Sequence, residues 1–403
     1  MTYRTRVAAV FLLGFFLDLI NMFIASVAFP AMGQALHATP SALAWVSNGY
    51  IAGLTLVIPF SAMLARLLGA KRLILLSLFV FSAASAAAGL ASTLDSLIAW
   101  RVIQGLGGGL LIPVGQALAW QQFKPHERAR LSSAVMLVAL LAPACSPALG
   151  GMLVQTLGWR WIFFATLPVA ALAFVLAGLW LRNEKPQQTL TRRLLHLPLL
   201  KDPLLRFSML VYLCVPGTFI GVNVMGMFYL QSIARLTPAE TGALMLPWSL
   251  ASFMAITATG RYFNRTGPRP LIVLGCLLQA IGMGLLIGIG PDTPFTLPVL
   301  AFTLMGAGGS LCSSTAQSSA FLTIPHDAMP DASALWNLNR QLSFFLGALV
   351  LAALLSLAQR YLPPLTAWHG IFLFAAGVTL LPLLAVIRLN NAKVLRQLQQ
   401  ENV

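Results

Sequence analysis

Apolar runs long enough to cross a lipid bilayer recur along this chain. A helix needs about 20 mostly apolar residues to span the hydrocarbon core of a membrane. Runs of about that length occupy residues 7–30, 42–65, 72–93, 96–120, 131–157, 160–181, 205–232, 239–262, 270–290, 297–322, 331–357 and 366–388. Apolar residues make up 58% of the 403 residues and charged residues 9%, which a water-soluble surface does not tolerate. The sequence therefore predicts an all-α polytopic membrane protein with twelve transmembrane helices.

One polar stretch divides the runs into two sets of six. Residues 182–204 are too few and too charged to contain further spans. We expect a six-helix bundle over residues 1–181, a cytoplasmic linker over 182–204, and a second six-helix bundle with a cytoplasmic polar tail over 205–403.

The positions of lysine and arginine predict the orientation. Arg160, Arg235 and Arg360 fall in loops on one side, and Arg101 and Arg340 fall inside helices. The remaining 20 of the 25 basic residues fall on the opposite side. Because basic residues accumulate on the cytoplasmic side, we expect both termini in the cytoplasm and the chain in the inner (plasma) membrane. This topology also explains the net charge of +15, which therefore does not indicate nucleic-acid binding.

Three short motifs recur about 200 residues apart and in the same order. The pairs are Ala62–Arg72 with Gly260–Arg269, Gln104–Gly108 with Met305–Gly309, and Pro125–Glu127 with Pro325–Asp327. Repeated six-helix halves are typical of secondary transporters, whose substrate site lies between the repeats. The predicted fold is thus two pseudo-symmetric bundles.

A single arginine, Arg101, lies inside the apolar segment 97–116. An ionised side chain at membrane depth costs about 3 kcal/mol or more, so it is usually retained for a partner within the protein. Gln104 lies one turn further on, and Gly105 with Gly109 has the spacing that lets a neighbouring helix approach closely. Arg101 is therefore a candidate functional residue. The alternative is a packing helix whose arginine extends to a lipid headgroup.

Four segments carry a family resemblance. They are Leu97–Gly105, Pro143 with Ser146–Gly151, Gly158–Phe164, and the set Tyr229–Gln231, Thr237, Pro238, Gly242 and Pro247. Together they resemble the major facilitator superfamily and, within it, the drug:proton antiporters of the EmrB/QacA-like branch. The resemblance implies that Pro143, Pro147, Gly150 and Gly151 belong to the antiporter motif of the fifth helix.

The chain departs from that branch in its helix count and its first helix. Members usually have fourteen helices, and this linker has no room for the central pair, so a twelve-helix form is expected. Asn21 stands where the family motif opens with an aspartate, and Asp18 lies one turn earlier on the same face.

Asp18 is the only one of the ten acidic residues that we predict at membrane depth. A carboxyl group away from water favours its protonated form, whereas a guanidinium beside it favours the carboxylate. A carboxyl whose distance from Arg101 changes with conformation can thus take up a proton outside and release it inside. We predict that Asp18 and Arg101 are the proton-coupling pair. The alternative is a structural Asp18 bonded to nearby hydroxyls and amides.

The loop after the second span departs from the family pattern at the cytoplasmic gate. The family has an aspartate three residues before a glycine in this loop, and this chain has Arg66 before Gly69, followed by Arg72. In the second half, Asn264 precedes Gly267 in the same way.

An acidic partner for Arg66 is available in the loop before the eleventh span. Asp327 and Asp331 lie there, in the only predicted inner loop without lysine or arginine. We therefore predict an inverted bridge from Arg66 to Asp331 or Asp327 that closes the cytoplasmic side. The alternative is that Arg66 is a positive-inside charge with no fixed partner.

Polar and aromatic residues within the spans outline a substrate cavity. The predicted set is Asn21, Gln104, Asn223, Trp248, Asn337 and Arg340. A mostly neutral and partly aromatic lining suits amphipathic or cationic organic compounds. Arg340 leaves an anionic substrate open as well, because a buried guanidinium can bind an anionic group.

The sequence carries no enzyme signature. It has no Walker A loop, its five histidines form no metal-ligand set, and its glycine-rich segment 105–109 lies within a span rather than after a strand. We expect no enzyme activity, no metal and no cofactor besides the coupling protons.

The predicted function is secondary active transport in the lipid bilayer. We expect a monomer that exports drugs or other small amphipathic organic compounds against protons, by alternating access. Two alternatives stay open: a metabolite exporter or importer, and a membrane sensor or assembly partner without transport. An outer-membrane or adaptor partner is also left open.

Overall fold

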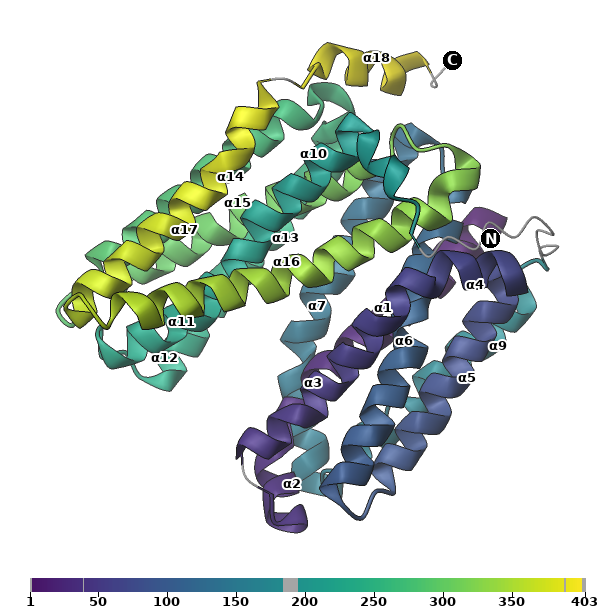
Figure 1. Cartoon of the computed structure of the whole chain (residues 1–403), viewed down its shortest axis with the longest axis horizontal. Coiled ribbons are helices and arrows are strands. Elements are labelled where there is room, and N and C mark those ends of the chain that lie inside the picture. The colour runs from purple at the N-terminus through teal and green to yellow at the C-terminus, as the bar shows by residue number, and fades with distance from the viewer. Residues whose placement is uncertain (1, 39, 184–194, 388, 401–403) are drawn as a thin grey trace. The chain divides into compact units, whose positions relative to one another are not determined.

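A computed structural model describes residues 2–38, 40–183, 195–387 and 389–400, and every regular element in these residues is a helix (Figure 1). Before the linker the elements are α1 (Tyr3–Val27), α2 (Phe29–Leu36), α3 (Pro40–Val57), η1 (Ile58–Phe60), α4 (Ser61–Leu68), α5 (Ala70–Gly89), α6 (Leu94–Gln122), α7 (Pro125–Leu157), α8 (Trp161–Phe164) and α9 (Leu167–Trp180). After it come η2 (Leu197–Lys201), α10 (Pro203–Tyr212), η3 (Leu213–Gly217), α11 (Thr218–Ser232), α12 (Pro238–Ala243), α13 (Met245–Thr266), α14 (Pro268–Leu285), η4 (Leu286–Gly288), α15 (Thr296–Ala320), η5 (His326–Ala328), α16 (Met329–Ala358), α17 (Pro364–Val386) and α18 (Asn391–Gln400).

Eleven helical segments in the described residues are long and apolar enough to cross a membrane. Each matches one of the predicted spans, and several consist of two or three consecutive elements, such as α3, η1 and α4. The other predicted span, 131–157, lies within α7, a helix of 33 residues. The predicted all-α, membrane-spanning fold class is therefore confirmed.

The chain folds into two compact units. Unit 1 comprises Met1–Phe123, Leu137–Leu197 and Ile324–Leu338, and unit 2 comprises Lys124–Met136, Pro198–Thr323 and Asn339–Val403. The helix α7 therefore begins in unit 2 and continues in unit 1, whereas α16 begins in unit 1 and continues in unit 2. These units follow packing rather than chain order, so the predicted division at residues 182–204 stays a prediction.

The helix α6 is central to unit 1, where it packs against α1, α3 and α5. A Cβ atom added to Gly105 would overlap the Tyr50 carbonyl oxygen on α3, and one added to Gly109 would lie 2.6 Å from the Leu54 carbonyl oxygen. The close approach predicted from the spacing of these two glycines is therefore confirmed, and the neighbouring helix is α3.

The helix α15 has the corresponding place in unit 2, where it packs against α10, α13 and α14. A Cβ atom added to Gly306 would overlap the Trp248 carbonyl oxygen on α13, and one added to Gly308 would overlap the backbone of α14 at Gln279. The glycines of the repeated motif thus hold two neighbouring helices close in each unit.

Two glycines mark equivalent turns in the two units. Gly69 separates α4 from α5 with a φ of 81°, and Gly267 separates α13 from α14 with a φ of 73°. Glycine adopts this left-handed region without a steric cost, and residues with a Cβ atom rarely do. The two predicted gate loops therefore turn in the same way.

The polar tail contains a helix that the sequence reasoning did not predict. In α18, Val394 and Leu398 are buried against a cluster that includes Phe263. The Asn391 side chain donates to the Thr266 carbonyl oxygen at 2.9 Å and accepts from the Arg269 amide at 3.2 Å. Asn391 thus satisfies backbone groups on both sides of the turn at Gly267.

Candidate functional site

Asp18 lies on α1 in a closed environment made by α3 and α6. Its side chain is fully buried, and the Tyr50 hydroxyl on α3 donates a hydrogen bond to its Oδ1 atom. A Cβ atom added to Gly108 on α6 would lie 2.6 Å from the Tyr50 Oη atom and 2.7 Å from the Asp18 Oδ1 atom. The absence of a side chain at Gly108 therefore provides the space for this pair.

Arg101 joins the same three helices through all three of its guanidinium nitrogens. It donates from Nε to the Val46 carbonyl oxygen at 3.0 Å, from Nη1 to Gln104 Oε1 at 2.7 Å, and from Nη2 to the Asn21 carbonyl oxygen at 3.0 Å. Gln104 in turn donates to Asn21 Oδ1 at 2.9 Å. The guanidinium carbon lies 4.4 Å from the centre of the Tyr50 ring, a cation–π contact.

Tyr50 therefore contacts both members of the predicted proton-coupling pair. The structure brings Asp18, Asn21, Arg101 and Gln104 into one buried network of unit 1. That reasoning missed Tyr50. The available signal was a tyrosine within an apolar span and next to a glycine, which is a weak one because tyrosine also packs against lipid and protein.

The segment predicted to be the antiporter motif lies on α7. The side chains of Pro143 and Pro147 lie outside the described residues. A Cβ atom added to Gly150 would lie 3.0 Å from Ile24 Cγ1, and one added to Gly151 would lie 4.0 Å from a Val27 methyl group. The two glycines therefore face the end of α1, the helix that carries Asp18.

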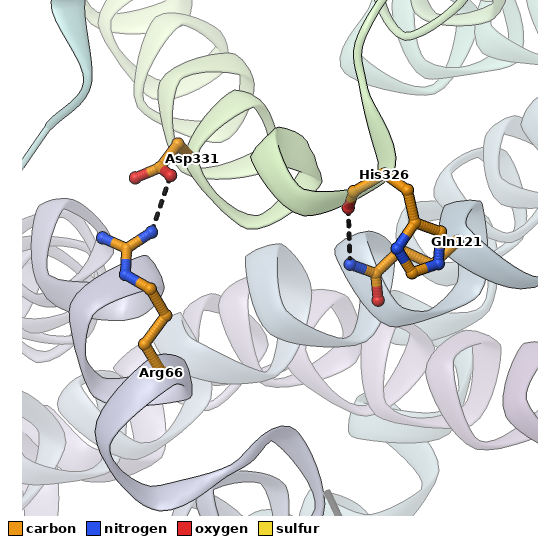
Figure 2. Close-up of polar contacts among 4 residues, drawn as sticks. All are labelled: Arg66, Gln121, His326 and Asp331. Atoms are coloured by element: carbon orange, nitrogen blue, oxygen red, sulfur yellow. Dashed lines mark hydrogen bonds and ion pairs between the residues drawn. The ribbon is translucent and has the colours of Figure 1, made fainter. Parts of the chain in front are cut away.

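The predicted gate residues Arg66 and Asp331 form an ion pair. Arg66 Nη1 on α4 lies 2.6 Å from Asp331 Oδ2 in the first turn of α16, as Figure 2 shows. The Asp331 side chain is 9% exposed and that of Arg66 is 19% exposed. Asp327, the other predicted partner, is exposed on η5, and Arg72 is exposed on α5.

A cavity of about 290 Å³ lies beside this ion pair, within unit 1. Its lining residues are Ser61, Ala62, Ala65, Arg66, Gly69, Ala70, Pro113, Val114, Ala117, Leu118, Gln121, His326, Asp327 and Pro330. The Gln121 side chain donates to the His326 carbonyl oxygen at 2.9 Å (Figure 2). The ends of α4 and α6 are thus both bonded to the segment that leads into α16.

A third set of contacts holds α16 to α6 further along the helix. Asn337 Nδ2 donates to Gln116 Oε1 at 2.6 Å, and Ser333 Oγ donates to the Pro113 carbonyl oxygen at 2.8 Å. The predicted cavity residue Asn337 is therefore bonded within unit 1. Ser333 is missing from the predicted site.

The corresponding contacts in unit 2 join side chains to backbone. The Asn264 side chain donates to the His126 carbonyl oxygen, at the start of α7. Ser133 on α7 donates to the Ile256 carbonyl oxygen on α13 at 3.0 Å. The predicted gate residue Asn264 thus bonds the start of α7, as Arg66 bonds the start of α16.

The other predicted cavity residues lie in unit 2. Trp248 on α13 stacks on Phe219 of α11, with ring centres 5.4 Å apart and planes 8° from parallel. Asn223 lies one turn beyond Phe219 on α11 and is half-buried. Arg340 lies on the unit 2 part of α16 and is 8% exposed.

Comparisons with known proteins agree with this architecture. The chain is 26% identical to a multidrug resistance protein B homolog of Mycobacterium tuberculosis, over 87% of this chain and 76% of that protein. It is 22% identical to the lincomycin resistance protein LmrB of Bacillus subtilis, over 86% of this chain and 85% of that protein. The crystal structure of the human organic anion transporter MFSD10 superposes with a TM-score of 0.76 at 18% identity, covering 96% of this chain and all of that one.

A family model supplies the identification. The model of the Major Facilitator Superfamily matches residues 11–348, which is most of the chain. Together with the helical architecture, this match shows that the protein belongs to the Major Facilitator Superfamily and is a secondary transporter rather than an enzyme.

Proposed function

We propose that this transporter exports small amphipathic organic compounds in exchange for protons, and that Asp18 carries the proton. The observation that supports the proposal most directly is the buried network around Asp18. It contains the only acidic residue predicted at membrane depth, and the groups around Asp18 come from two other helices. Ionisable groups within the membrane are commonly part of ion or proton pathways.

The network provides a way to couple the proton to a movement of helices. Hydrogen bonding from Tyr50 and the nearby charge of Arg101 favour the carboxylate form of Asp18. Separation of both α3 and α6 from α1 would remove both influences and leave a carboxyl group in an apolar environment, where the protonated form is favoured. A cycle between the two arrangements takes up one proton and releases it.

The Arg66–Asp331 ion pair acts as the cytoplasmic gate in this proposal. It holds the first turn of α16 to α4 in unit 1, and α16 belongs to unit 2 from Asn339 onward. Movement of α16 away from α4 must break the ion pair. We therefore assign the bonded arrangement to the state in which the cytoplasmic side is closed.

Two observations support an organic substrate. Several relatives are named as drug resistance or drug efflux proteins, including the drug efflux pump JefA of Mycobacterium tuberculosis. The ring of Trp248, which stacks on the buried ring of Phe219, is partly exposed, and such an aromatic face suits amphipathic or cationic compounds. One proton that moves inward through 100 mV supplies about 2.3 kcal/mol, enough for a gradient of roughly fifty-fold in a neutral compound.

Transport by the reconstituted protein tests the proposal. Proteoliposomes with an imposed pH gradient are offered a panel of amphipathic cations, neutral compounds and carboxylates, and substrate accumulation and proton flux are recorded together. We expect proton-driven accumulation of at least one amphipathic compound. In Asp18→Asn, we expect uphill accumulation to be lost, so that the substrate only equilibrates, while substrate exchange without a gradient continues. Asp292→Asn, which removes an exposed acid, should behave as the parent protein. Uphill accumulation by Asp18→Asn would refute the assignment.

One observation favours a second function, the transport of an anionic metabolite. Arg340 is a buried charge on α16, and a guanidinium binds carboxylates well. In that case only the carboxylates of the panel would move, and Arg340→Gln would abolish their transport. Binding of a compound without any flux would favour a sensor instead.

A further inference from the structure

We infer that Gln116, Ser333 and Asn337 form a second lock on the cytoplasmic side, one that contains no charged group. Gln116 and Asn337 are each 2% exposed, and Ser333 is fully buried. Gln116 Oε1 accepts hydrogen bonds from Asn337 Nδ2 at 2.6 Å and from Ser333 Oγ at 3.1 Å. Asn337 also donates to the Ser333 carbonyl oxygen at 2.9 Å, so the three side chains hold one another in place.

This lock lies beyond the ion pair on the same helix. Asn337 follows Asp331 by six residues on α16, which corresponds to about 9 Å along the helix axis. The helix α16 is thus bonded to α4 through Asp331 and to α6 through Ser333 and Asn337. If α16 swings away from unit 1 as a rigid helix, it must break both sets of bonds.

The two locks differ in how they respond to salt. The ion pair is partly exposed, and dissolved ions screen the attraction between exposed charges. The amide and hydroxyl groups of the second lock are neutral and buried, so salt has little effect on their hydrogen bonds. Separating them leaves buried polar atoms unpaired, which is costly until water enters. High salt should therefore weaken the first lock while the second stays closed.

The cavity beside the ion pair provides a reporter position. Ala117 on α6 lines this cavity and is buried. A cysteine at this position becomes accessible to a charged maleimide only when the start of α16 moves away. In Ala117→Cys protein in lipid nanodiscs, the labelling rate at residue 117 is measured by peptide mass spectrometry, so the four native cysteines can stay. The measurement needs neither a substrate nor a proton gradient.

We expect the labelling rate of the Ala117→Cys parent to change less than twofold between 0.1 M and 1 M NaCl. Adding Asn337→Leu should raise the rate about tenfold and make it rise at least threefold further in 1 M NaCl, because only the ion pair remains. Ser333→Ala, which removes one hydroxyl and should fold normally, should raise the rate about threefold. The double variant with Gln116→Leu and Asn337→Leu should label within twofold of Asn337→Leu alone, because both changes break the Asn337–Gln116 bond and Ser333 keeps its bond to the Pro113 carbonyl oxygen.

Gln317→Leu is the matched control. Gln317 corresponds to Gln116 in the repeat and is a buried glutamine of α15 in unit 2. Its replacement should leave the rate within twofold of the parent rate. The inference fails if Asn337→Leu and Ser333→Ala both label at the parent rate, or if the parent is as sensitive to salt as Asn337→Leu. The role of the lock in transport rests on the proposed function, but the labelling result does not, so the two can fail separately.

Discussion

The central helices of the two units, α6 and α15, share a packing pattern but differ in chemistry. Gly105 and Gly306 both lie against a neighbouring backbone, on α3 and α13 respectively. Four residues before these glycines the two helices differ, because Arg101 corresponds to Phe302, a core residue of unit 2. The repeat therefore preserves how the helices pack, while the ionisable network is built in unit 1.

Gly108 and Gly309 show the same contrast at a single position. Gly108 leaves room for the bonded Asp18 and Tyr50 side chains, whereas Gly309 leaves room for the end of the Gln279 side chain, 2.5 Å from an added Cβ atom. One glycine accommodates a candidate proton carrier, and its counterpart accommodates a neutral amide. This difference supports the proposal that the two units have separate tasks, with proton chemistry in unit 1.

Changing the central arginine and its counterpart should give the largest difference between the units. Arg101→Lys keeps the charge but cannot reproduce three hydrogen bonds that leave from three different nitrogens. We expect the initial rate of proton-driven uptake to fall about 100-fold. Phe302→Leu, the matched change in unit 2, should stay within threefold of the parent when normalised to folded protein. Equal losses in the two variants would contradict a division of tasks.

Replacing Gly108 or Gly309 with alanine should give a smaller difference in transport between the two units. Gly108→Ala places a methyl group within 2.7 Å of both Tyr50 Oη and Asp18 Oδ1, so the pair must separate. We expect accumulation to fall about twentyfold. Gly309→Ala displaces only the end of a flexible side chain and should cost less than threefold. The same pH-gradient assay measures both, and a reversed order would break the comparison.

The contacts of the proposed gate should give an intermediate effect, and that effect should be reversible by a second substitution. Arg66→Asp places two carboxylates together and should lower transport about tenfold. The charge-swapped double variant, Arg66→Asp with Asp331→Arg, should recover to within threefold of the parent. Asn264→Ala in unit 2 removes a neutral contact to backbone and should have little effect on flux. A double variant as poor as Arg66→Asp would exclude a specific ion pair.

The smallest predicted effect concerns α18. Asn391→Ala removes a side chain that satisfies backbone groups on both sides of the turn at Gly267, and losing such a cap costs about 1 kcal/mol. We expect the midpoint of thermal unfolding to fall by about 2 °C, with normal transport. Thermal unfolding in detergent, followed by tryptophan fluorescence, measures the shift. A large loss of flux would show that α18 has a role beyond stability.

The positions of the helices, the internal repeat and the candidate charged residues could all be predicted from the sequence alone. Apolar length is a local property, and in lipid a span must satisfy its backbone hydrogen bonds internally, so the positions of the helices follow from composition. Asp18 and Arg101 were predictable because an ionisable group is conspicuous in an apolar span. The helix α18 could not be predicted, because it is short and polar. Its buried residues Val394 and Leu398 are too few to distinguish it from a solvated segment.

Which side chains contact one another is visible in the tertiary structure alone. Tyr50 bonds Asp18 across 32 residues and Asn337 bonds Gln116 across 221 residues, and neither pairing leaves a local pattern in the sequence. The sequence offered Asp327 and Asp331 as equal partners for Arg66, and the start of α16 presents Asp331. The physical reason is that contacts depend on how each helix is rotated and paired with its neighbours. Packing of the whole unit sets that rotation, and the length and composition of a single span do not.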